Sequence, residues 1–191
     1  MINTEKLFQV LSAIHPLPRG FKEALSKELQ IISYPKNHFL VQMYCVAQYC
    51  YFLENGFAVA YHLHEGKKIV TSFFKPSEIV FSPKRFFEKS QAEENIQLTI
   101  DSDLIVISSS SVHKLFEDFP VANLLARAVT ADYYVKSQRQ RIERHSLTAW
   151  ERYQKLHADF PRIEMNATQE LIASYLNITP QSLSRLRHER N

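Results

Sequence analysis

The side chains best suited to recognition chemistry lie near the end of the chain. Gln181, Ser182, Arg185 and His188 fall on one face of a segment with helical periodicity. The guanidinium of Arg185 can donate two hydrogen bonds to a guanine, and short polar groups beside it suit contacts in a DNA major groove. An ordinary solvated helix would carry the same residue types, because Gln, Ser and Arg are common on protein surfaces. Taken alone, this face leaves both interpretations open.

Two short helices joined by a tight turn, within residues 168–191, would position these side chains. Their apolar residues are spaced to form one small core: Leu171, Ile172, Tyr175, Leu176, Ile178, Leu183 and Leu186. The pattern predicts a helix-turn-helix, a motif that places its second helix in the major groove. An ordinary amphipathic helical hairpin is the alternative.

The corner between these helices has residues suited to a tight turn. Ala173 is small where the helices must approach, and Asn177 tolerates the left-handed conformation that the turn requires. Thr179 is a good N-cap, and Pro180 suits the first turn of a helix because its missing N–H would be unpaired there. We therefore expect the second helix to span residues 180–190.

Composition and charge are compatible with a folded, DNA-facing protein. The chain has 191 residues, of which 45% are hydrophobic and 12% aromatic, with a net charge of +3. Residues 132–191 carry 10 Lys and Arg against 7 Asp and Glu, whereas residues 1–131 carry 13 of each. The whole excess of positive charge lies in the C-terminal third, as expected if that end faces nucleic acid.

No apolar run reaches the length of a membrane span, and residues 1–11 lack a signal-peptide pattern. We therefore expect a cytoplasmic protein with no membrane partner. Cys45 and Cys50 stand in C-x4-C spacing with no second ligand pair nearby, which predicts two buried thiols and no metal site.

The middle of the chain has the pattern of an antiparallel β domain. Helical spacing over residues 3–14 and 20–30, around a break at 15–18, gives way to short aromatic and β-branched runs. Strands are predicted at 38–42, 49–53, 57–63, 68–74, 96–100 and 104–108, with turns at 54–56 and 65–66. Several short strands without long helices between them predict an antiparallel roll or barrel.

A long helix is expected from about Pro120. Its apolar and small residues step by three and four, as in a heptad repeat: Val121, Leu124, Ala128, Ala131, Val135, Gln138 and Ile142. This seam suits a parallel dimer, because paired helix-turn-helix units that read half-sites need a two-fold axis. A single helix packed on its own β domain remains the alternative.

Taken in order, these parts resemble the Crp-Fnr family of bacterial transcription regulators. The resemblance is carried by LENGFAVAYH, FFKPSEIVF, IDSDLIVIS, LTAWERYQKLHADFP and, most specifically, IASYLNITPQSLSRLR. It implies an α+β fold with an antiparallel β-roll, a double-stranded β-helix of jelly-roll-like form, as the sensor domain. A long dimerisation helix and a small helical DNA-binding domain would follow. We expect boundaries at 1–119, 120–145 and 146–191.

The resemblance also assigns functional positions in the DNA-binding domain. Gln181 and Arg185 correspond to positions that read bases, while Thr168, Thr179 and Ser182 correspond to phosphate contacts. The implied partners are double-stranded DNA with a palindromic site, a second copy of the chain and RNA polymerase. Pro180 and Gln181 depart from the charged pair of the best-known member, so its operator sequence does not carry over. The only candidate for a preceding wing strand is Arg162–Met165.

The cyclic-nucleotide pocket of that family departs from its pattern here. Ser77-Glu78 stands in place of a Gly-Glu pair, and the Arg that would bind the cyclic phosphate falls near Ala92. Glu93 and Glu94 would repel a phosphate at that point. Lys84 and Arg85 could supply replacement charge for another anion. The pattern argues against cyclic AMP, leaves open an unknown small-molecule effector or none, and identifies no certain cofactor.

Two alternatives from other classes remain. His62-Leu63-His64 matches the H-x-H of cupin-type metal enzymes, because residues two apart on a strand point the same way. A ligand-free β-roll that binds another protein is the second alternative. The chain has no nucleophile elbow or phosphate loop. We therefore expect no catalytic or metal-binding residues.

Overall fold

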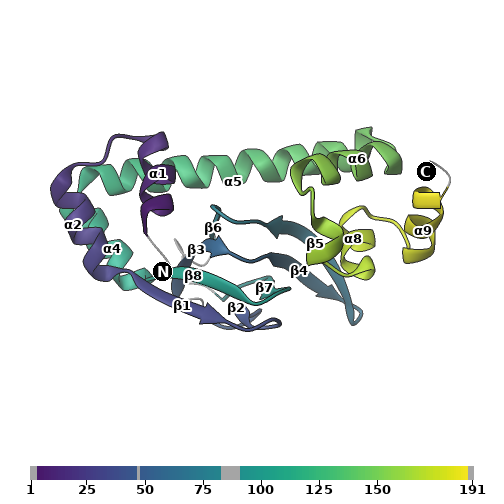
Figure 1. Ribbon diagram of the computed structural model, residues 1–191, viewed down its shortest axis with the longest axis horizontal. Coiled ribbons are helices and arrows are strands. Elements are labelled where there is room, and N and C mark those ends of the chain that lie inside the picture. Colours follow the sequence, from purple (N-terminus) through teal and green to yellow (C-terminus); the bar gives the residue numbers. More distant parts are fainter. Residues whose placement is uncertain (1–3, 47, 83–90, 189–191) are drawn as a thin grey trace.

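Two antiparallel four-stranded sheets form the centre of the molecule. The computed structural model describes residues 4–46, 48–82 and 91–188. One sheet has the strand order β1-β8-β3-β6 and the other β2-β7-β4-β5 (Figure 1). The strands are β1 (Gln30–Tyr34), β2 (Phe39–Val41), β3 (Tyr49–Asn55), β4 (Ala58–His64), β5 (Lys67–Phe74), β6 (Ile79–Val80), β7 (Asn95–Leu98) and β8 (Ser102–Ser108).

Helices cover the outer faces of both sheets, which explains why the strands are apolar on both sides. In β4, Ala58 and Ala60 pack in the core between the sheets, whereas Val59 and Tyr61 face a second core on the other side. Alternate residues of a strand point to opposite faces, so a strand buried on both faces needs a continuous apolar run. The run FAVAY from Phe57 meets that requirement.

The N-terminal helices and the start of the long helix close the outer face of the first sheet. They are α1 (Glu5–Ile14), α2 (Arg19–Glu28), α4 (Ser109–Asp118) and α5 (Pro120–Ser146). Phe52 of β3 and Ile105 of β8 pack there against Leu11, Phe21 and Leu125. In Figure 1, α1, α2 and α4 lie around the beginning of α5, at the end of the molecule away from the C-terminus.

All six predicted strands form, with ends that differ by up to two residues, but two others were not predicted. The helical pattern assigned to residues 20–30 ends at Glu28, and Gln30 pairs with Val106 as β1 begins. Strand β6, Ile79–Val80, is too short for a periodicity to develop. The turn at 65–66 is confirmed, since Glu65 and Gly66 both have positive φ.

The prediction of two buried thiols is wrong for Cys45. Its side chain is exposed, whereas that of Cys50 is half-buried. Burial raises the pKa of the Cys50 thiol to about 12, so this sulfur stays protonated. Cys45 lies in the segment after β2, outside the regular pairing of the strands, and for that reason strand alternation does not bury it.

The long helix α5 is confirmed and runs past the sheets, along one side of the molecule (Figure 1). Its start is buried, but large apolar side chains of the seam are exposed farther along, including Val135 at 59% and Ile142 at 64%. No described helix is both long and apolar enough to cross a membrane.

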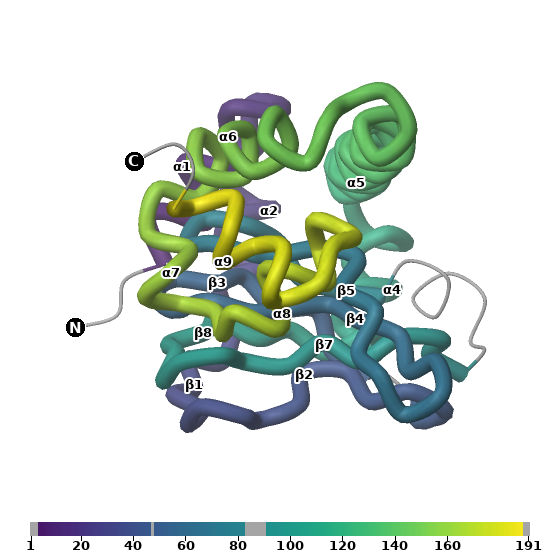
Figure 2. The backbone as a smooth tube through the Cα atoms, turned by 90° about the vertical axis from the view of Figure 1, so that its right-hand side faces the viewer, coloured from purple at the N-terminus to yellow at the C-terminus, as the bar shows by residue number. Residues whose placement is uncertain are grey.

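After α5, residues 147–188 form four shorter helices. They are α6 (Ala149–Asp159), α7 (Ile163–Asn166), α8 (Gln169–Tyr175) and α9 (Pro180–His188). The wing strand considered for residues 162–165 does not form, because this segment is a turn and the start of α7. Figure 2, which faces this end of the molecule, shows α8 and α9 in front of the sheets.

Candidate nucleic-acid interface

The corner between α8 and α9 has the conformation expected from its residues. Asn177 adopts φ of +53°, and Ala173 is 1% exposed where the helices meet. The N–H of Ile178 donates to the carbonyl of Ala173 at 3.0 Å, which closes the turn. Asn tolerates the left-handed region better than other non-glycine residues, so this position holds the turn at low cost.

Both helices begin with a threonine cap. The hydroxyl of Thr168 accepts from the N–H of Leu171 at 3.4 Å, and that of Thr179 accepts from the N–H of Ser182 at 3.1 Å. The Thr179 and Ser182 hydroxyls are also 2.9 Å apart. All three predicted phosphate-contact residues are therefore exposed at helix beginnings, where N–H groups and the helix dipole favour anions.

The polar face of α9 is open to solvent. Gln181 and Arg185 are exposed, and neither side chain has a hydrogen bond or ion pair with the described residues. Arg187 differs, because its guanidinium pairs with Glu164 of α7, which also contacts His157 at 3.1 Å. The structure thus leaves Arg185 available for a ligand while Arg187 attaches α9 to α7.

The helical C-terminal region is packed directly on the β-roll. Strand β5 is at the edge of its sheet, and edge strands present unpaired backbone groups. Ser174 of α8 satisfies two of them, since its hydroxyl accepts from the N–H of Val70 at 2.9 Å and donates to the carbonyl of Lys68 at 2.7 Å. Arg144 of α5 donates to the carbonyl of Val70 at 3.1 Å.

The predicted core of the motif is consequently part of a larger one. Ile172, Leu176 and Leu183 pack with Val70 and Phe73 of the roll. Leu171, Tyr175 and Ile178 are partly buried against the same cluster, whereas Leu186 does not belong to it. Sequence periodicity identified the apolar face of the helices but could not reveal that a sheet covers it.

Arg152 of α6 connects the ends of two other helices, α5 and α8. Its guanidinium donates to the carbonyl of Leu176, at the end of α8, at 3.0 Å from Nη2 and 3.2 Å from Nε. It also donates to the carbonyl of Leu147, after α5, at 2.5 Å. The last carbonyls of a helix lack partners within that helix, so one arginine satisfies groups on two helices and fixes their relative position.

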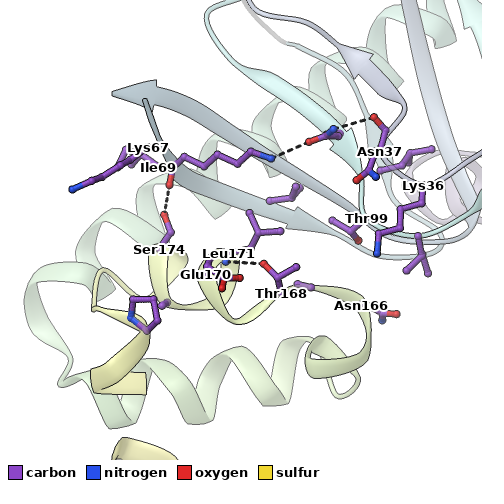
Figure 3. Close-up of a pocket in the computed structure, with 18 of the residues that line it drawn as sticks. Lys36, Asn37, Lys67, Ile69, Thr99, Asn166, Thr168, Glu170, Leu171 and Ser174 are labelled. Carbon is purple, nitrogen blue, oxygen red and sulfur yellow. Dashed lines mark hydrogen bonds between the residues drawn. The ribbon is translucent and has the colours of Figure 1, made fainter. Parts of the chain in front are cut away.

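A groove of about 920 Å³ separates the beginnings of α8 and α9 from the roll. In Figure 3, Thr168 and Glu170 lie on the helical side, while Lys36 comes from a turn of the roll and Lys67 from the first position of β5. Lys68 also lines the groove, but its ammonium donates to Gln97 at 3.2 Å. The sequence analysis did not identify these lysines, since no local pattern relates residues 36 and 67 to 168.

Two of the predicted effector residues, Ser77 and Glu78, lie elsewhere, in a cavity of about 790 Å³ between the roll and α5. Ser77 has φ of +71°, so it occupies a conformation that glycine adopts most easily. Glu78 accepts from the backbone N–H of Lys75 at 3.0 Å and pairs with Lys136 of α5 at 3.5 Å. Lys84 and Arg85 are outside the described residues.

Glu94 is the most deeply buried acid of this cavity, at 9% exposed. Burial raises the pKa of its carboxyl, as does the neighbouring Glu93, whereas His62 opposes the rise. Its carboxyl also forms hydrogen bonds with the side chains of Tyr133 and Thr71. Burial and the adjacent Glu94 in turn raise the pKa of the Tyr133 hydroxyl. An acidic group, and not the arginine of the family pattern, therefore lies in this part of the wall, as the sequence indicated.

Ala92, near which the family pattern has its arginine, is part of the core. Ala92 is 1% exposed, and its backbone exchanges hydrogen bonds with Tyr44 and Cys45 at 2.8 and 3.1 Å. A side chain as long as arginine has no space at that position without displacing core residues.

The histidine pair of β4 does not have the surroundings of a metal centre. The Nδ1 atom of His62 is 2.7 Å from the carbonyl oxygen of Glu93, and His64 is exposed near the turn. Within residues 4–46, 48–82 and 91–188, no group of three or more His, Cys, Asp or Glu side chains is arranged to hold a metal ion.

Comparison with known proteins gives matches only at the level of structure. No protein-family model and no curated protein sequence matches the chain. Among solved structures, FixK2 from Bradyrhizobium japonicum aligns with a TM-score of 0.72 and 21% identity, over 84% of this chain and 83% of that one. A candidate transcriptional regulator of the Crp-Fnr family from Eubacterium rectale has a TM-score of 0.74 and 16% identity, over 91% and 83%.

The c-di-GMP-responsive global regulator CLP of Xanthomonas campestris is also similar, with a TM-score of 0.70 and 15% identity, over 90% of this chain and 91% of that one. CLP is thus a global regulator, and the Eubacterium rectale protein is described as a transcriptional regulator. The likeness extends over both the roll and the C-terminal helices. The chain therefore has the fold of the Crp-Fnr regulators, as the resemblance implied.

Proposed function

We propose that this protein is a homodimeric transcription regulator of the Crp-Fnr type that binds a palindromic DNA site through α9. The observation that carries the proposal is the open polar face of α9, where Gln181 and Arg185 are exposed and without partners among the described residues. A helix with such a face, held on a tight helix-turn-helix corner, suits insertion into a major groove.

Within this proposal the side chains have separate roles. Arg185 binds a guanine through two hydrogen bonds, and Gln181 reads a neighbouring base. Thr168, Thr179 and Ser182 contact phosphates, which positions α9 without selecting sequence. Residues 146–191 serve as the DNA-binding part, 120–145 as the dimerisation helix and 1–119 as the sensor.

The dimer is supported by the exposed seam on α5. Leu124, Val135 and Ile142 are 45%, 59% and 64% exposed in the single chain. A second α5 packed in parallel would bury these side chains in heptad register. The two α9 helices would then be related by a two-fold axis, which matches a palindromic site with half-sites about one helical turn apart.

The sensor is proposed to respond to a ligand other than cyclic AMP, or to none. Each described cation in the wall of the α5 cavity already has a partner. Lys136 pairs with Glu78 and Asp132, Arg139 and Lys155 pair with Glu143, and Lys75 donates to the carbonyl of Asp159. No cation in this part of the chain is left for a cyclic phosphate, which would need one.

Two further features belong to the same proposal. A regulator bound at promoters acts in the cytoplasm, where RNA polymerase is an additional partner. The similarity to the c-di-GMP-responsive regulator CLP makes cyclic dinucleotides a class of effector to include in binding tests.

Selection of bound sequences from a random duplex library tests the function directly. The purified protein is incubated with the library alone, with cyclic AMP and with c-di-GMP, and bound duplexes are sequenced. We expect a palindrome with half-sites about one helical turn apart and no response to cyclic AMP. If no sequence is enriched under any of the three conditions, the C-terminal helices do not serve as a sequence reader and the proposal is wrong.

A further inference from the structure

A buried carboxyl group without a cationic partner lies in the wall of the cavity between the roll and α5. Glu94 is 9% exposed and comes directly before β7. Its side-chain partners are the hydroxyl groups of Thr71 on β5 and Tyr133 on α5. None of the ion pairs formed by the described cations of this wall includes Glu94. Because burial of a carboxylate is costly without an opposite charge, a cation at this point would stabilise it.

Aromatic rings lie next to this carboxyl group. Tyr133 bonds to Glu94 and also contacts Phe81, with the two ring centres 6.0 Å apart. Both rings line the cavity, as does Phe74, which is 6% exposed. The faces of aromatic rings attract organic cations, and this attraction is stronger where water is excluded. A carboxylate beside aromatic rings therefore suits an ammonium or guanidinium group and repels an anion.

The charge and size of the whole cavity agree with such a ligand. Its described acids are Glu78, Glu94, Asp132, Glu143 and Asp159, and its described cations are Lys75, Lys136, Arg139 and Lys155. Five acids against four cations leave a net charge of −1 when His62 is neutral. The volume of about 790 Å³ is in the range of small-molecule sites, about 300 to 1,000 Å³.

We infer that this cavity binds a small organic cation, an amine or guanidinium compound, with Glu94 as its counter-ion and with Phe81 and Tyr133 against its apolar part. The inference rests on the proposed function, because it names the class of effector to which the sensor would respond. Tyr133 belongs to α5, so a cation that takes over the carboxylate of Glu94 would change how the roll holds the proposed dimerisation helix.

Isothermal titration calorimetry of the full chain tests the ligand class. Benzylamine, choline and agmatine are the cations, and benzyl alcohol and benzoate are the neutral and anionic counterparts of benzylamine. We expect at least one cation to bind more tightly than benzyl alcohol, and benzoate not to bind.

Two variants that each remove one acid locate the site. Glu94→Gln should lower the affinity for the cation about tenfold or more, because a buried hydrogen bond between charged groups is lost. Asp159→Asn is the control, since Asp159 is an exposed acid of the same cavity wall, and it should retain the wild-type affinity.

Proton release is a readout that a purely structural role of Glu94 would not change. Burial raises the pKa of the Glu94 carboxyl, Glu93 adds to the rise and His62 opposes it. A bound cation would lower this pKa again, so binding should release protons at a pH just above the ordinary glutamate pKa. Titration in two buffers with different heats of ionisation should show this release for the wild type and not for Glu94→Gln.

The outcomes separate this inference from the proposed function. If no cation of the panel binds more tightly than benzyl alcohol, or if Glu94→Gln and Asp159→Asn lose affinity equally, the inference is wrong, whatever DNA the protein selects. If the wild type binds a cation at Glu94 but selects no palindrome with or without it, the binding site stands and the proposed function is wrong.

Discussion

At the scale of single residues, most of the informative positions are those where backbone conformation limits the side chain. Gly56, Ser77 and Asn177 all have positive φ, yet only the first is glycine. At Gly56 a Cβ atom would lie 2.0 Å from the Ser102 hydroxyl oxygen, so a second strand excludes any side chain. The residue type at such a position is limited by the backbone conformation and by neighbouring atoms, and not by contact with a ligand.

Gly56→Ala should therefore destabilise the protein strongly. The cost of positive φ and the clash with Ser102 should together lower the free energy of unfolding by about 3 kcal/mol or more. Gly66→Ala is the control, because its φ is +76° but no atom lies within 4 Å of the added Cβ, and it should cost about 1 to 2 kcal/mol. Urea denaturation measures both, and equal losses would contradict the clash.

Arg185→Ala should weaken binding to the selected duplex by about 1 to 3 kcal/mol and relax the preference at one base pair of each half-site. The reason is that a bidentate arginine discriminates guanine from other bases. Arg19→Ala is the control, because it removes the same charge from α2, where Arg19 pairs with Glu23. It should leave the base preference unchanged. Competition binding with single-base variants is the measurement. A uniform loss of affinity over all variants would instead assign Arg185 to a phosphate.

Glu94 should make stability depend on pH. Burial raises the pKa of the Glu94 carboxyl above its ordinary value, so the folded state holds the proton more tightly than the unfolded state. Stability should thus fall as the pH rises from about 4.5 through the raised pKa. The groups that face Glu94 are His62, which opposes the shift, and Glu93, Tyr133 and Thr71.

Glu94→Gln removes this titration. The free energy of unfolding of the variant minus that of the wild type should be larger at pH 7 than at pH 4.5. Urea denaturation of both proteins at both pH values measures this difference. A difference in stability between the two proteins that is independent of pH would mean that Glu94 has the same pKa in both states. Glu117→Gln, on exposed α4 surface, controls for the loss of one carboxylate.

At the scale of elements, the exposed apolar side chains of α5 indicate what this helix packs against. The first turns of α5 pack against α1 and α4, whereas the later turns expose Val135 and Ile142. A helix that belonged only to its own β domain would bury its apolar face along its whole length. The exposed half of the seam therefore favours a second copy of the helix over a monomer.

Val135→Glu with Ile142→Glu should dissociate the dimer. Charges at facing heptad positions would be buried without partners, which is costly. Ser137→Glu with Gln140→Glu is the control, because it adds the same two negative charges at heptad positions away from the seam and should leave the dimer intact. Sedimentation equilibrium determines the mass of each protein. A wild-type protein that sediments as a single chain would contradict the dimer.

At the scale of the whole molecule, the roll and the C-terminal helices share one core. Phe57, Val70 and Phe73 of the roll pack with Leu156, Ile172 and Leu183 of the helices. Ser174 of α8 and Arg144 of α5 add hydrogen bonds to β5 at the same junction. A structural change in the roll should consequently alter the packing of the C-terminal helices, and the reverse should also hold. This shared core is a physical basis for coupling an effector to DNA binding.

Phe73→Ala should therefore reduce hydrogen-exchange protection in α8 as well as in β5. Truncation of a buried phenylalanine costs about 3 to 5 kcal/mol, and here the cavity would lie between the two parts. Phe21→Ala truncates an equally buried ring that packs with α1, α4 and α5. Its largest local effect should be in those helices. Equal loss of protection in α8 for both variants would mean that the shared core has no special role.

The sequence by itself determined the elements whose pattern is local. Helical spacing, the Asn177 corner and the Thr179-Pro180 start identified the helix-turn-helix, and alternating apolar runs identified six strands, because these signals lie within a few residues of one another. Strands β1 and β6 were not identified, since the first follows a helical pattern and the second is two residues long.

Only the tertiary structure decided which faces meet. It joined Ser174 to β5, placed Lys36, Lys67 and Thr168 in the lining of one groove, and exposed Cys45. Some of these contacts connect residues about a hundred positions apart in the sequence. Lys68 and Ser174, for example, are separated by 106 positions. Periodicity reports only which face of an element is apolar, and many partners could cover that face. The choice among them depends on packing and on backbone groups left unpaired at a sheet edge.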